Sequence, residues 1–345
     1  MSIALDATYS VGDSLSGVGV YSREILWGLA EAHPETKFLW CYRPHRILRS
    51  LNDRIPSNAS RRLLRYSKAP KARLFHALNQ RVEFPAKTIP VVTTFHDLFV
   101  LTGEYSTPDF RAKFTEQARR AAERSDLIIA VSKYTGDLVR ELLRPKAPIH
   151  VVHHGVYLPK MPPPGEQQRQ NVILHVGALQ KRKNVERLIE AFEVAAPEDW
   201  KLVLAGSAGG FAGEKVVARV TSSKAASRIE ITGYVEDERL IELYRTSRIL
   251  AFPSLDEGFG IPVVEAMAHG LPVITSDGSA LKEVAGDAAI LVKPQQTGSI
   301  AEAIGTLTAV PGLRNQLREM GWARAQNFTW FRAAQETWNC YQRLL

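Results

Sequence analysis

Short apolar runs alternate with helix-like patterns along almost the whole chain of 345 residues. An alternation of strands and helices is typical of parallel sheets whose faces are covered by helices. The runs that we interpret as strands are Ile3–Asp6, Phe38–Tyr42, Leu74–His76, Val91–Phe95, Leu127–Val131, His150–His153, Val172–Val176, Leu202–Ala205, Ile229–Thr232, Ile249–Phe252, Val273–Ser276 and Ile290–Val292. The pattern predicts an α/β protein with doubly wound, Rossmann-like sheets.

A proline-rich stretch divides this pattern in two. Leu158–Gly165 contains four prolines and is typical of a stiff linker between domains. The chain is also longer than one ordinary hydrophobic core supports. We therefore predict one domain at residues 1–160, a second at residues 161–325 and a final helix at residues 326–345. Doubly wound sheets bind ligands outside the carboxyl ends of their strands, so we expect a cleft between those ends.

The most distinctive motif is SLDEGFGIPVVEAMAHGLPVI, at residues 254–274. Its first carboxylate, Glu257, precedes a predicted helix, and Glu265 lies in the first turns of that helix. Gly258 and Gly260 let the backbone approach a ligand, and the N–H groups at the helix start favour an anion. An anion with hydroxyl groups on either side describes a nucleotide sugar. For the spacing of the two carboxylates alone, an incidental acidic pair beside a helix is the simpler alternative.

This block resembles the signature of the family 4 retaining glycosyltransferases, which have the two-domain GT-B fold. The resemblance implies that Glu257 contacts the donor sugar and that Glu265 contacts the ribose. It assigns contacts to the sugar or the phosphates to the backbone of Phe259, Gly260 and Ile261. It also implies that residues 1–160 bind the acceptor, that residues 161–325 bind the nucleotide sugar, and that the final helix crosses back onto the first domain.

A second motif, HVGALQKRKNVERLIEAF at His175–Phe192, follows the first strand of the second domain. Arg182 and Lys183 come at the carboxyl end of that strand, where cations can neutralise a diphosphate leaving group without a metal ion. The stretch resembles the family's Arg-Lys-Asn element, which assigns both side chains to the phosphates and Gly177 to the nucleotide site. Ala178 stands where many members have arginine, although a subgroup has a small residue there. Taken alone, the stretch is most simply interpreted as a solvated basic loop.

A glycine pair near the start of the chain provides a third match. Gly17 and Gly19 resemble the family's Gly-rich loop, which faces the donor phosphates and the acceptor. The alternative is that they only make the turn. The same pattern could open a dinucleotide fingerprint, but Ser22 occupies the place of its third glycine.

Polar residues also follow a buried strand of the first domain. His96 and Asp97 stand at the strand end that faces ligands and match the family's strand-end His-Asp, in which the His lies beside the donor sugar. A lone His at such a place is otherwise often a structural residue. Further along, His154 replaces the Asn of the family's Asn-Gly-Val turn, which we interpret as a hinge element.

Composition indicates a soluble, cytoplasmic protein. Hydrophobic residues make up 45% of the chain, and no apolar run approaches the ~18 residues of a transmembrane helix. The first residues are typical of a strand rather than of a signal peptide. Cys41 and Cys340 stand at opposite ends of the sequence, which favours a reducing compartment and argues against a disulfide framework or a zinc site.

Positive charge is concentrated in the first domain. Residues 1–160 contain 24 Lys and Arg against 15 Asp and Glu, whereas residues 161–345 contain 20 against 21. The segment Arg43–Arg73 alone contains ten basic residues and a single acidic one. The apolar residues of this segment recur at the spacing of one helix face: Ile47, Leu48, Leu51 and Ile55. Such a segment suits an anionic membrane surface or a phosphate-bearing acceptor. The alternative is a solvated basic face. Nucleic acid would be attracted by the same charge, but no nucleic-acid motif accompanies the segment.

Together the motifs predict a retaining hexosyltransferase that uses a nucleotide-diphosphate sugar. The acceptor hydroxyl attacks the anomeric carbon on the face from which the diphosphate leaves, and the leaving phosphate is the expected base. No Asp-x-Asp motif occurs, so we expect no metal and no cofactor, with Arg182, Lys183 and the helix dipole in their place. Glu257 then orients the sugar and His96 supports it near the reacting carbon.

The resemblance favours GDP-mannose as donor and a glycan or lipid-linked acceptor in cell-surface polysaccharide synthesis. The enzyme is expected in the cytoplasm, resting on the inner membrane face through Arg43–Arg73. Three alternatives remain open: a sugar-nucleotide epimerase of similar architecture, a non-catalytic nucleotide-binding module and, least favoured, a nicotinamide-dependent oxidoreductase.

Overall fold

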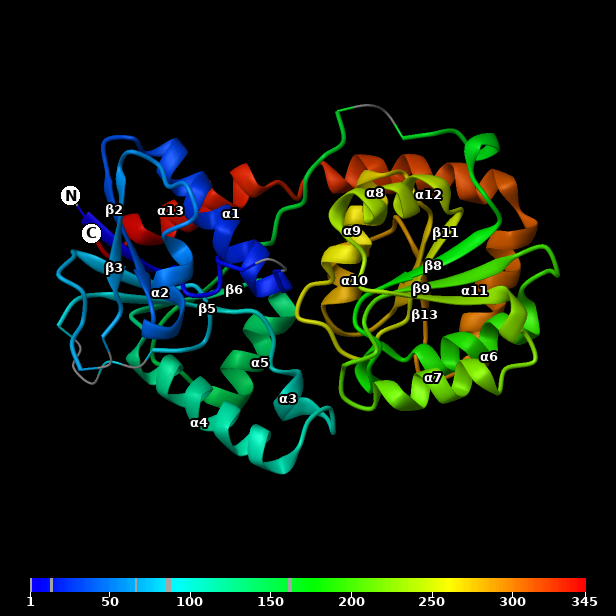
Figure 1. Ribbon diagram of the computed structural model, residues 1–345, viewed down its shortest axis with the longest axis horizontal. Helices are drawn as coiled ribbons and strands as arrows, with labels where there is room; N and C mark the ends of the chain where they lie inside the picture. The colour runs from blue at the N-terminus through cyan, green and yellow to red at the C-terminus, as the bar shows by residue number, and fades with distance from the viewer. Residues whose placement is uncertain (1, 13–14, 66, 83, 85–87, 161–162) are drawn as a thin grey trace. The chain divides into compact units, whose positions relative to one another are not determined.

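The chain folds into two compact units, shown in a computed structural model that describes all residues except 1, 13–14, 66, 83, 85–87 and 161–162 (Figure 1). The first unit comprises the residues up to Gly155 together with Thr329–Leu345, and the second comprises Val156–Phe328. These limits lie within a few residues of the boundaries expected at residues 160 and 325.

A parallel sheet forms the centre of the first unit. Its strands within the described residues are β1 (Ser2–Asp6), β2 (Lys37–Tyr42), β3 (Ala59–Leu63), β4 (Leu74–Ala77), β5 (Val91–Phe95), β6 (Leu127–Ala130) and β7 (Ile149–Val151). They lie in the order β3-β2-β1-β4-β5-β6-β7, and each neighbouring pair is parallel. The helices of this unit are α1 (Gly17–Ala32), α2 (Pro44–Ser50), α3 (Phe99–Thr102), α4 (Pro108–Arg124), α5 (Lys133–Leu143) and α13 (Trp330–Gln342).

The last helix, α13, packs beside α1 in this unit (Figure 1). The contact is close, because a Cβ at Gly28 of α1 would lie 2.9 Å from the Cβ of Ala334. Both helices bury apolar side chains against the same face of the sheet, in one cluster with Phe38 and Trp40 of β2. The crossing of the final helix onto the first unit is therefore confirmed.

The second unit repeats this architecture. Its described strands are β8 (Val172–Val176), β9 (Lys201–Ala205), β10 (Ile229–Gly233), β11 (Ile249–Phe252), β12 (Val273–Ser276) and β13 (Ile290–Val292). They form a parallel sheet in the order β10-β9-β8-β11-β12-β13. The helices are α6 (Val185–Ala195), α7 (Gly213–Thr221), α8 (Asp237–Thr246), α9 (Ile261–Ala268), α10 (Ser279–Ala285), α11 (Thr297–Ala309) and α12 (Pro311–Ala325). Two Rossmann-like units confirm the expected fold class.

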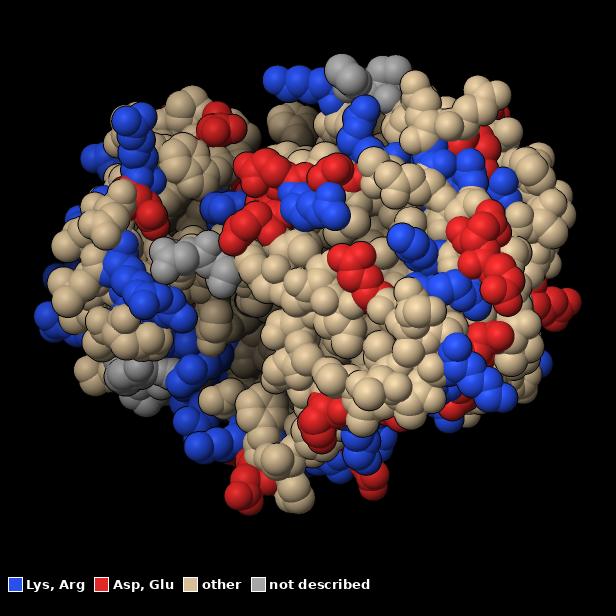
Figure 2. Space-filling view, turned by 45° about the vertical axis from the view of Figure 1, so that its right-hand side comes forward, with Lys and Arg blue, Asp and Glu red and all other residues tan. Residues whose placement is uncertain are grey.

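The basic segment Arg43–Arg73 differs from the single amphipathic stretch that its spacing suggested. Helix α2 ends at Ser50, and Ala59–Leu63 forms the edge strand β3, which the sequence pattern missed. Arg43 is 1% exposed and pairs with Asp6 at 3.2 Å, so this side chain belongs to the interior. Figure 2 shows how the Lys and Arg side chains of the molecule spread over its surface.

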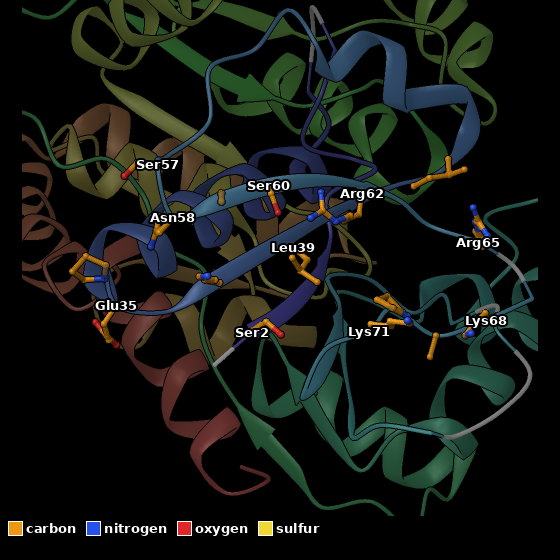
Figure 3. Close-up of a pocket in the computed structure, with 16 residues that line it drawn as sticks. Ser2, Glu35, Leu39, Ser57, Asn58, Ser60, Arg62, Arg65, Lys68 and Lys71 are labelled. Atoms are coloured by element: carbon orange, nitrogen blue, oxygen red, sulfur yellow. The ribbon is translucent and has the colours of Figure 1, made fainter.

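The remainder of the basic segment provides two separate surfaces. Leu48 and Leu51 are exposed beside Arg49, whereas Ile47 and Ile55 pack against the core, so only half of the apolar face is open. Farther along, residues 57–60, 62–63, 65 and 68–71 line much of a groove that is drawn in Figure 3.

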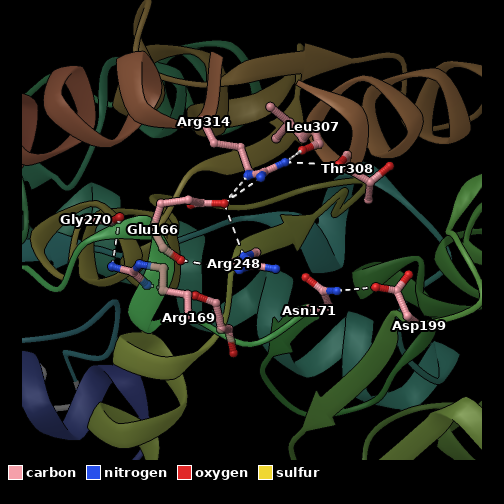
Figure 4. A network of polar contacts seen from close by, with 10 residues as sticks. Glu166, Arg169, Asn171, Asp199, Arg248, Gly270, Leu307, Thr308 and Arg314 are labelled. Atoms are coloured by element: carbon pink, nitrogen blue, oxygen red, sulfur yellow. Dashed lines mark hydrogen bonds and ion pairs between the residues drawn. The ribbon is translucent and has the colours of Figure 1, made fainter. Parts of the chain in front are cut away.

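An arginine network holds the start of the second unit in place (Figure 4). Arg169 is buried and donates to the carbonyl oxygens of Tyr244, Ser247, His269 and Gly270, at 2.7–3.0 Å. These carbonyls lie at the C-terminal ends of α8 and α9, where the helix itself offers no donor. Nearby, Glu166 accepts from Arg314 at 2.6 Å and pairs with Arg248 at 3.2 Å. The C-terminal ends of α8 and of α9, the helix that carries Glu265, are thus fastened to the segment after the linker.

Candidate active site

The loop after β8 brings cations to the carboxyl end of the second sheet. Gly177 ends the strand at φ +134°, and a Cβ there would lie 3.3 Å from Cε of Lys183. Glycine is therefore the residue that this close approach favours. A single 3-10 turn, Lys181–Lys183, follows and leads into α6.

Asn184 fixes the end of that turn. It adopts a left-handed backbone conformation at φ +59°, which asparagine tolerates better than most residues. Its side-chain amide donates to the carbonyl of Pro253 at 3.0 Å and to that of Pro294 at 2.6 Å. The cationic turn is therefore attached to the loops that follow β11 and β13.

Glu257 binds both cations of the turn. Its Oε1 lies 2.6 Å from Nζ of Lys183, and its Oε2 lies 2.7 Å from Nη1 of Arg182. Each of the three side chains is about one-tenth exposed. Burial alone would raise the pKa of Glu257, but the charges of Arg182 and Lys183 outweigh it and lower the pKa to about 2. The carboxylate is therefore ionised at neutral pH.

The glycines after Glu257 give α9 its starting point. Gly260 has φ +103°, and a Cβ there would lie 2.5 Å from Cδ2 of Leu281. The helix begins at Ile261 with Pro262 in its first turn, where the missing N–H costs no hydrogen bond. Phe259 is buried, and its ring lies edge-on to that of Phe328 at 5.7 Å. The positive end of α9 and the cationic turn both adjoin the Glu257 loop, an arrangement that suits an anion.

Glu265 lies in α9 and differs from Glu257 in its surroundings. Its Oε2 accepts a hydrogen bond from the hydroxyl of Tyr244 at 2.9 Å. Burial raises the pKa of Glu265, and the hydrogen bond from Tyr244 opposes that rise. The ring of His269 stacks on Tyr244 at 5.4 Å, while its Nδ1 lies 2.8 Å from the carbonyl oxygen of Glu265. Glu265 is thus held by a neutral partner rather than by a cation.

In the first unit, the glycine pair opens α1. Ser16 caps the helix by accepting from the N–H of Gly19 at 3.3 Å. A Cβ at Gly19 would lie 2.8 Å from the carbonyl oxygen of Tyr9, so this position has no room for a side chain. Gly17, the first residue of the helix, is exposed.

His96 is more deeply enclosed than a residue that only lines a ligand site. Its Nε2 donates to the carbonyl of Leu78 at 2.8 Å, and its Nδ1 lies 3.4 Å from Nε2 of His154. The two imidazoles stack at 5.3 Å, and Tyr21 meets both edge-on. Burial lowers the pKa of His96 to about 4, so the ring is neutral at pH 7. The neighbouring Asp97 is half-buried.

The sequence-predicted residues therefore gather in separate groups. Gly177, Arg182, Lys183 and Glu257 meet in the second unit, with the backbone of Phe259, Gly260 and Ile261 directly after them and Glu265 on the following helix. The first unit holds Gly17, Gly19, His96 and Asp97.

Comparison with known proteins assigns the chain to a family. Residues 16–158 match the family described as Glycosyltransferase Family 4, and residues 159–324 match Glycosyl transferases group 1. The chain belongs to the family 4 glycosyltransferases. This glycosyltransferase is 29% identical to the O-antigen chain mannosyltransferase B of Escherichia coli, over 75% of the chain and 72% of that protein. Against other curated relatives, the aligned part covers between 34% and 64% of their length.

Solved structures share the fold of the glycosyltransferase. A sucrose-phosphate synthase from Thermosynechococcus elongatus superposes with a TM-score of 0.80 at 21% identity, covering 100% of this chain and 99% of that one. The Anabaena protein HepE, in complex with UDP and glucose, superposes with a TM-score of 0.75 at 18% identity, with full coverage of both chains.

Three residues of the glycosyltransferase's cation site were not singled out from the sequence. His175 of β8 is buried, and its ring stacks on Phe252 of β11 at 5.7 Å. Nζ of Lys183 lies 4.5 Å above the same Phe252 ring, a cation–π distance that helps to position the ammonium. Asn184 is the third. Only Asn184 carried a sequence signal for the site, because it completes the Arg-Lys-Asn element. His175 and Phe252 lie in apolar runs that the pattern identifies only as strands.

Among the residues that the structure describes, no three His, Cys, Asp or Glu side chains gather as a metal site would require. No helix in the described part of the chain is both long and apolar enough to cross a membrane.

Proposed function

We propose that this glycosyltransferase transfers a hexose, with retention of anomeric configuration, from a nucleotide-diphosphate sugar to a glycan or lipid-linked acceptor in cell-surface polysaccharide synthesis. The cluster of Arg182, Lys183 and Glu257 is the observation that carries the proposal. Two cations beside the positive end of α9 are suited to a diphosphate. A carboxylate in the same cluster can accept hydrogen bonds from sugar hydroxyls.

The proposed reaction needs no side-chain nucleophile. The acceptor oxygen forms a bond to the anomeric carbon as the bond from that carbon to the diphosphate oxygen breaks. The hydroxyl proton moves to the departing diphosphate, so charge and atoms balance without a metal ion. Arg182 and Lys183 stabilise the negative charge that develops on the leaving group, in a buried place where such stabilisation is strong. Glu257 keeps both cations in place and orients the sugar.

Glu265 is the proposed ribose contact. Within the described residues, the side-chain partner of this carboxylate is the phenol of Tyr244, so the carboxylate keeps acceptor capacity for a pair of vicinal hydroxyls. Tyr244 of α8 holds the side chain, and His269 at the end of α9 stacks on the Tyr244 ring. Nucleotide affinity therefore depends on Glu265, and turnover depends on Glu257.

GDP-mannose is the first choice of donor, because the curated relative is an O-antigen chain mannosyltransferase. Calorimetric titration with GDP, UDP, ADP and dTDP identifies the base, and mass spectrometry then follows transfer from the matching sugar nucleotides. Proton NMR of the product reports the anomeric configuration. An inverted product, or an epimerised donor formed without any acceptor, would contradict the proposal.

Membrane contact is proposed for the exposed end of α2. Leu48 and Leu51 are 75% and 62% exposed, and Arg49 and Arg54 are exposed beside them. Near an anionic bilayer each basic residue contributes about 1 kcal/mol, and the two leucines add apolar burial. The protein is then expected at the inner face of the membrane, bound reversibly.

Vesicle flotation tests this contact. Wild-type protein is expected to float with phosphatidylglycerol vesicles at low salt and to detach at ~1 M salt, where the Debye length falls to ~3 Å. A Leu48→Ser/Leu51→Ser variant should lose flotation, whereas Phe110→Ser, which removes an exposed ring of α4, should retain it. Equal recovery with neutral and anionic vesicles would rule the contact out.

A further inference from the structure

The first unit contains a groove that the proposed reaction does not use. It has a volume of about 820 Å³, within the range of sites that hold sizeable ligands (Figure 3). It lies against strands β2 and β3 and the chain segment that leads to β4. The residues that define it here are Glu35, Lys37, Leu39, Ser60, Arg62 and Lys71.

The groove exists because the edge of the sheet is uncovered on one face. Along β2, Phe38 and Trp40 point to the core beneath α1 and α13, so Lys37 and Leu39 point to the opposite face. Leu39 is in register with Ser60 of β3, and both line the groove. Every lining residue comes from a strand or a loop, so the floor is open sheet rather than a helix surface.

The groove begins at the starts of three strands and runs along the edge strand β3 as far as Leu63 and Arg65. Ser2, Lys37 and Ala59 begin β1, β2 and β3, and all three line it. Gly19 and His96 follow the carboxyl ends of β1 and β5 instead. The groove therefore occupies the strand starts and the outer edge of the sheet, whereas the site-bearing loops follow the carboxyl ends of inner strands.

Charge selects the kind of molecule that fits. The described lining contains five basic side chains and one acidic side chain, Glu35. The basic residues are Lys37, Arg62, Arg65, Lys68 and Lys71. All five are exposed, and none of them pairs with a carboxylate among the residues that the structure describes. In Figure 3, Arg62, Lys68 and Lys71 lie to one side of Leu39 while Glu35 lies on the other. Within the described residues, no carboxylate therefore pairs with the cations at this positive end.

We propose that this groove binds an anionic glycan, as a second docking site for the acceptor chain of the transferase reaction. The inference rests on the proposed function, because it names the acceptor as a chain that carries carboxylate or phosphate groups. The cations contact those groups, Asn58 and Ser60 offer hydrogen bonds to hydroxyls, and Leu39 and Pro70 offer apolar contact to sugar rings. A second contact along one chain raises the effective concentration of its reacting end.

A groove suits a chain better than a bilayer or a nucleic acid. A flat membrane surface cannot enter a hollow whose floor is the backbone of two strands, and the exposed leucines of α2 do not line it. Bases bind by stacking on aromatic rings, and none of the described lining residues is aromatic. The glycan therefore accounts for both the shape and the charge.

Binding of defined oligosaccharides tests the inference. The probes are fluorescent oligogalacturonate, which carries carboxylates, and a neutral dextran oligomer of the same length, both at low ionic strength. The wild-type protein is expected to bind oligogalacturonate and not dextran. Lys68→Glu/Lys71→Glu should weaken that binding at least about 10-fold, and Lys68→Gln/Lys71→Gln should weaken it less. The matched control Lys113→Glu/Arg119→Glu changes two exposed cations of α4 and should stay within about 2-fold of wild type.

The outcomes separate this inference from the proposed function. Folding is checked by thermal unfolding, and GDP and UDP affinity should be the same in all four proteins. Equal oligogalacturonate affinity in wild type and Lys68→Glu/Lys71→Glu, equal binding of dextran, or no binding of either probe would overturn the groove assignment. Loss of phosphatidylglycerol flotation in that variant, with oligogalacturonate binding intact, would make the groove a membrane site instead. A protein that binds oligogalacturonate through the groove but turns over no sugar nucleotide leaves the groove standing and refutes the transferase proposal.

Discussion

At the scale of single residues, the two carboxylates of one motif differ in what holds them. Glu257 is paired with Arg182 and Lys183, whose charges outweigh burial and hold its pKa at about 2. Glu265 is hydrogen bonded to Tyr244, and burial raises its pKa. A diphosphate that binds the same cations must share them with Glu257. We therefore propose that the first carboxylate serves the chemistry and that the second serves binding.

Lys183→Ala is expected to lower kcat by ~100-fold or more, as removal of one donor to a developing oxyanion commonly does. The change also leaves Glu257 with one cation instead of two. Steady-state kinetics with a saturating donor measures the effect. Lys181→Ala, an exposed residue of the same turn, is the control and should change kcat by less than about 3-fold. Equal losses in both variants would remove the special role of Lys183.

Glu265→Ala is expected to weaken nucleotide binding by roughly 1.5–3 kcal/mol, the contribution of a hydrogen bond to a charged group. Turnover at saturating donor should change little. Calorimetry with the nucleoside diphosphate measures the affinity, and the corresponding deoxyribose nucleotide is the control, because it lacks one hydroxyl. A folded variant with wild-type affinity for the ribonucleotide would exclude the ribose contact.

At the scale of elements, the end of α9 depends on one guanidinium. Arg169 satisfies four carbonyl oxygens at the ends of α8 and α9, and it is 4% exposed. Each buried acceptor that loses its donor lowers the free energy of unfolding by about 1–3 kcal/mol. The loss of the donor to several carbonyls at once therefore has a large cost. The helix that carries Glu265 is thus positioned from its far end.

Arg169→Met is therefore expected to lower the free energy of unfolding by about 3 kcal/mol or more. Urea unfolding followed by circular dichroism measures this. Arg239→Met removes a half-exposed arginine of α8 that pairs with Glu242, and it should cost about 1 kcal/mol at most. A similar cost for the two variants would show that the carbonyls find other donors, such as water.

At the scale of the whole molecule, the alternation of strands and helices predicted both sheets, because buried parallel strands are continuous apolar runs. Strand β3 was missed, since an edge strand with the sequence Ala-Ser-Arg-Arg-Leu is half-exposed and has no such run. The motif residues Arg182, Lys183 and Glu257 were found because the motifs that contain them resemble those of the family 4 glycosyltransferases. Phe252 and His175 were not found, because the sequence pattern of a ring that packs beneath a lysine is the same as that of an ordinary core residue.

The enclosure of His96 was equally invisible in the sequence. Its neighbours Tyr21, Leu78 and His154 come from three distant segments, and only the folded sheet joins them. A related chain of hydrogen bonds runs from Tyr21 through Thr94 and His76 to Tyr341, at 2.9, 2.8 and 2.6 Å. It joins α1 and α13 through the sheet.

These buried histidines predict a stability that falls in mild acid. Burial lowers the pKa of His76 to about 3 and of His96 to about 4, from an ordinary value of 6.5. Between pH 6.5 and these values the unfolded chain binds protons that the folded chain does not. Each such group lowers the free energy of unfolding by up to about 1.4 kcal/mol per pH unit as the pH falls.

Urea unfolding at about pH 7.5 and about pH 5.5 measures this dependence. His76→Asn should reduce the slope by about one proton, although it lowers stability at both pH values by disturbing Thr94 and Tyr341. His45→Asn, which changes an exposed histidine, is the control and should keep the wild-type slope. An unfolding free energy that stays level across this pH range in the wild type would contradict the expected proton uptake.

The return of α13 to the first unit has a consequence for how the protein is made. The first unit is discontinuous, because residues 156–328 are inserted between its two segments. While the ribosome is still synthesising the second unit, the face of α1 that packs against α13 has no partner, and Trp330 and Tyr341 do not yet exist to cover it. The second unit is a single segment and can close as soon as it emerges. In a nascent chain, residues 329–345 therefore complete a unit whose other segment emerges before residues 156–328.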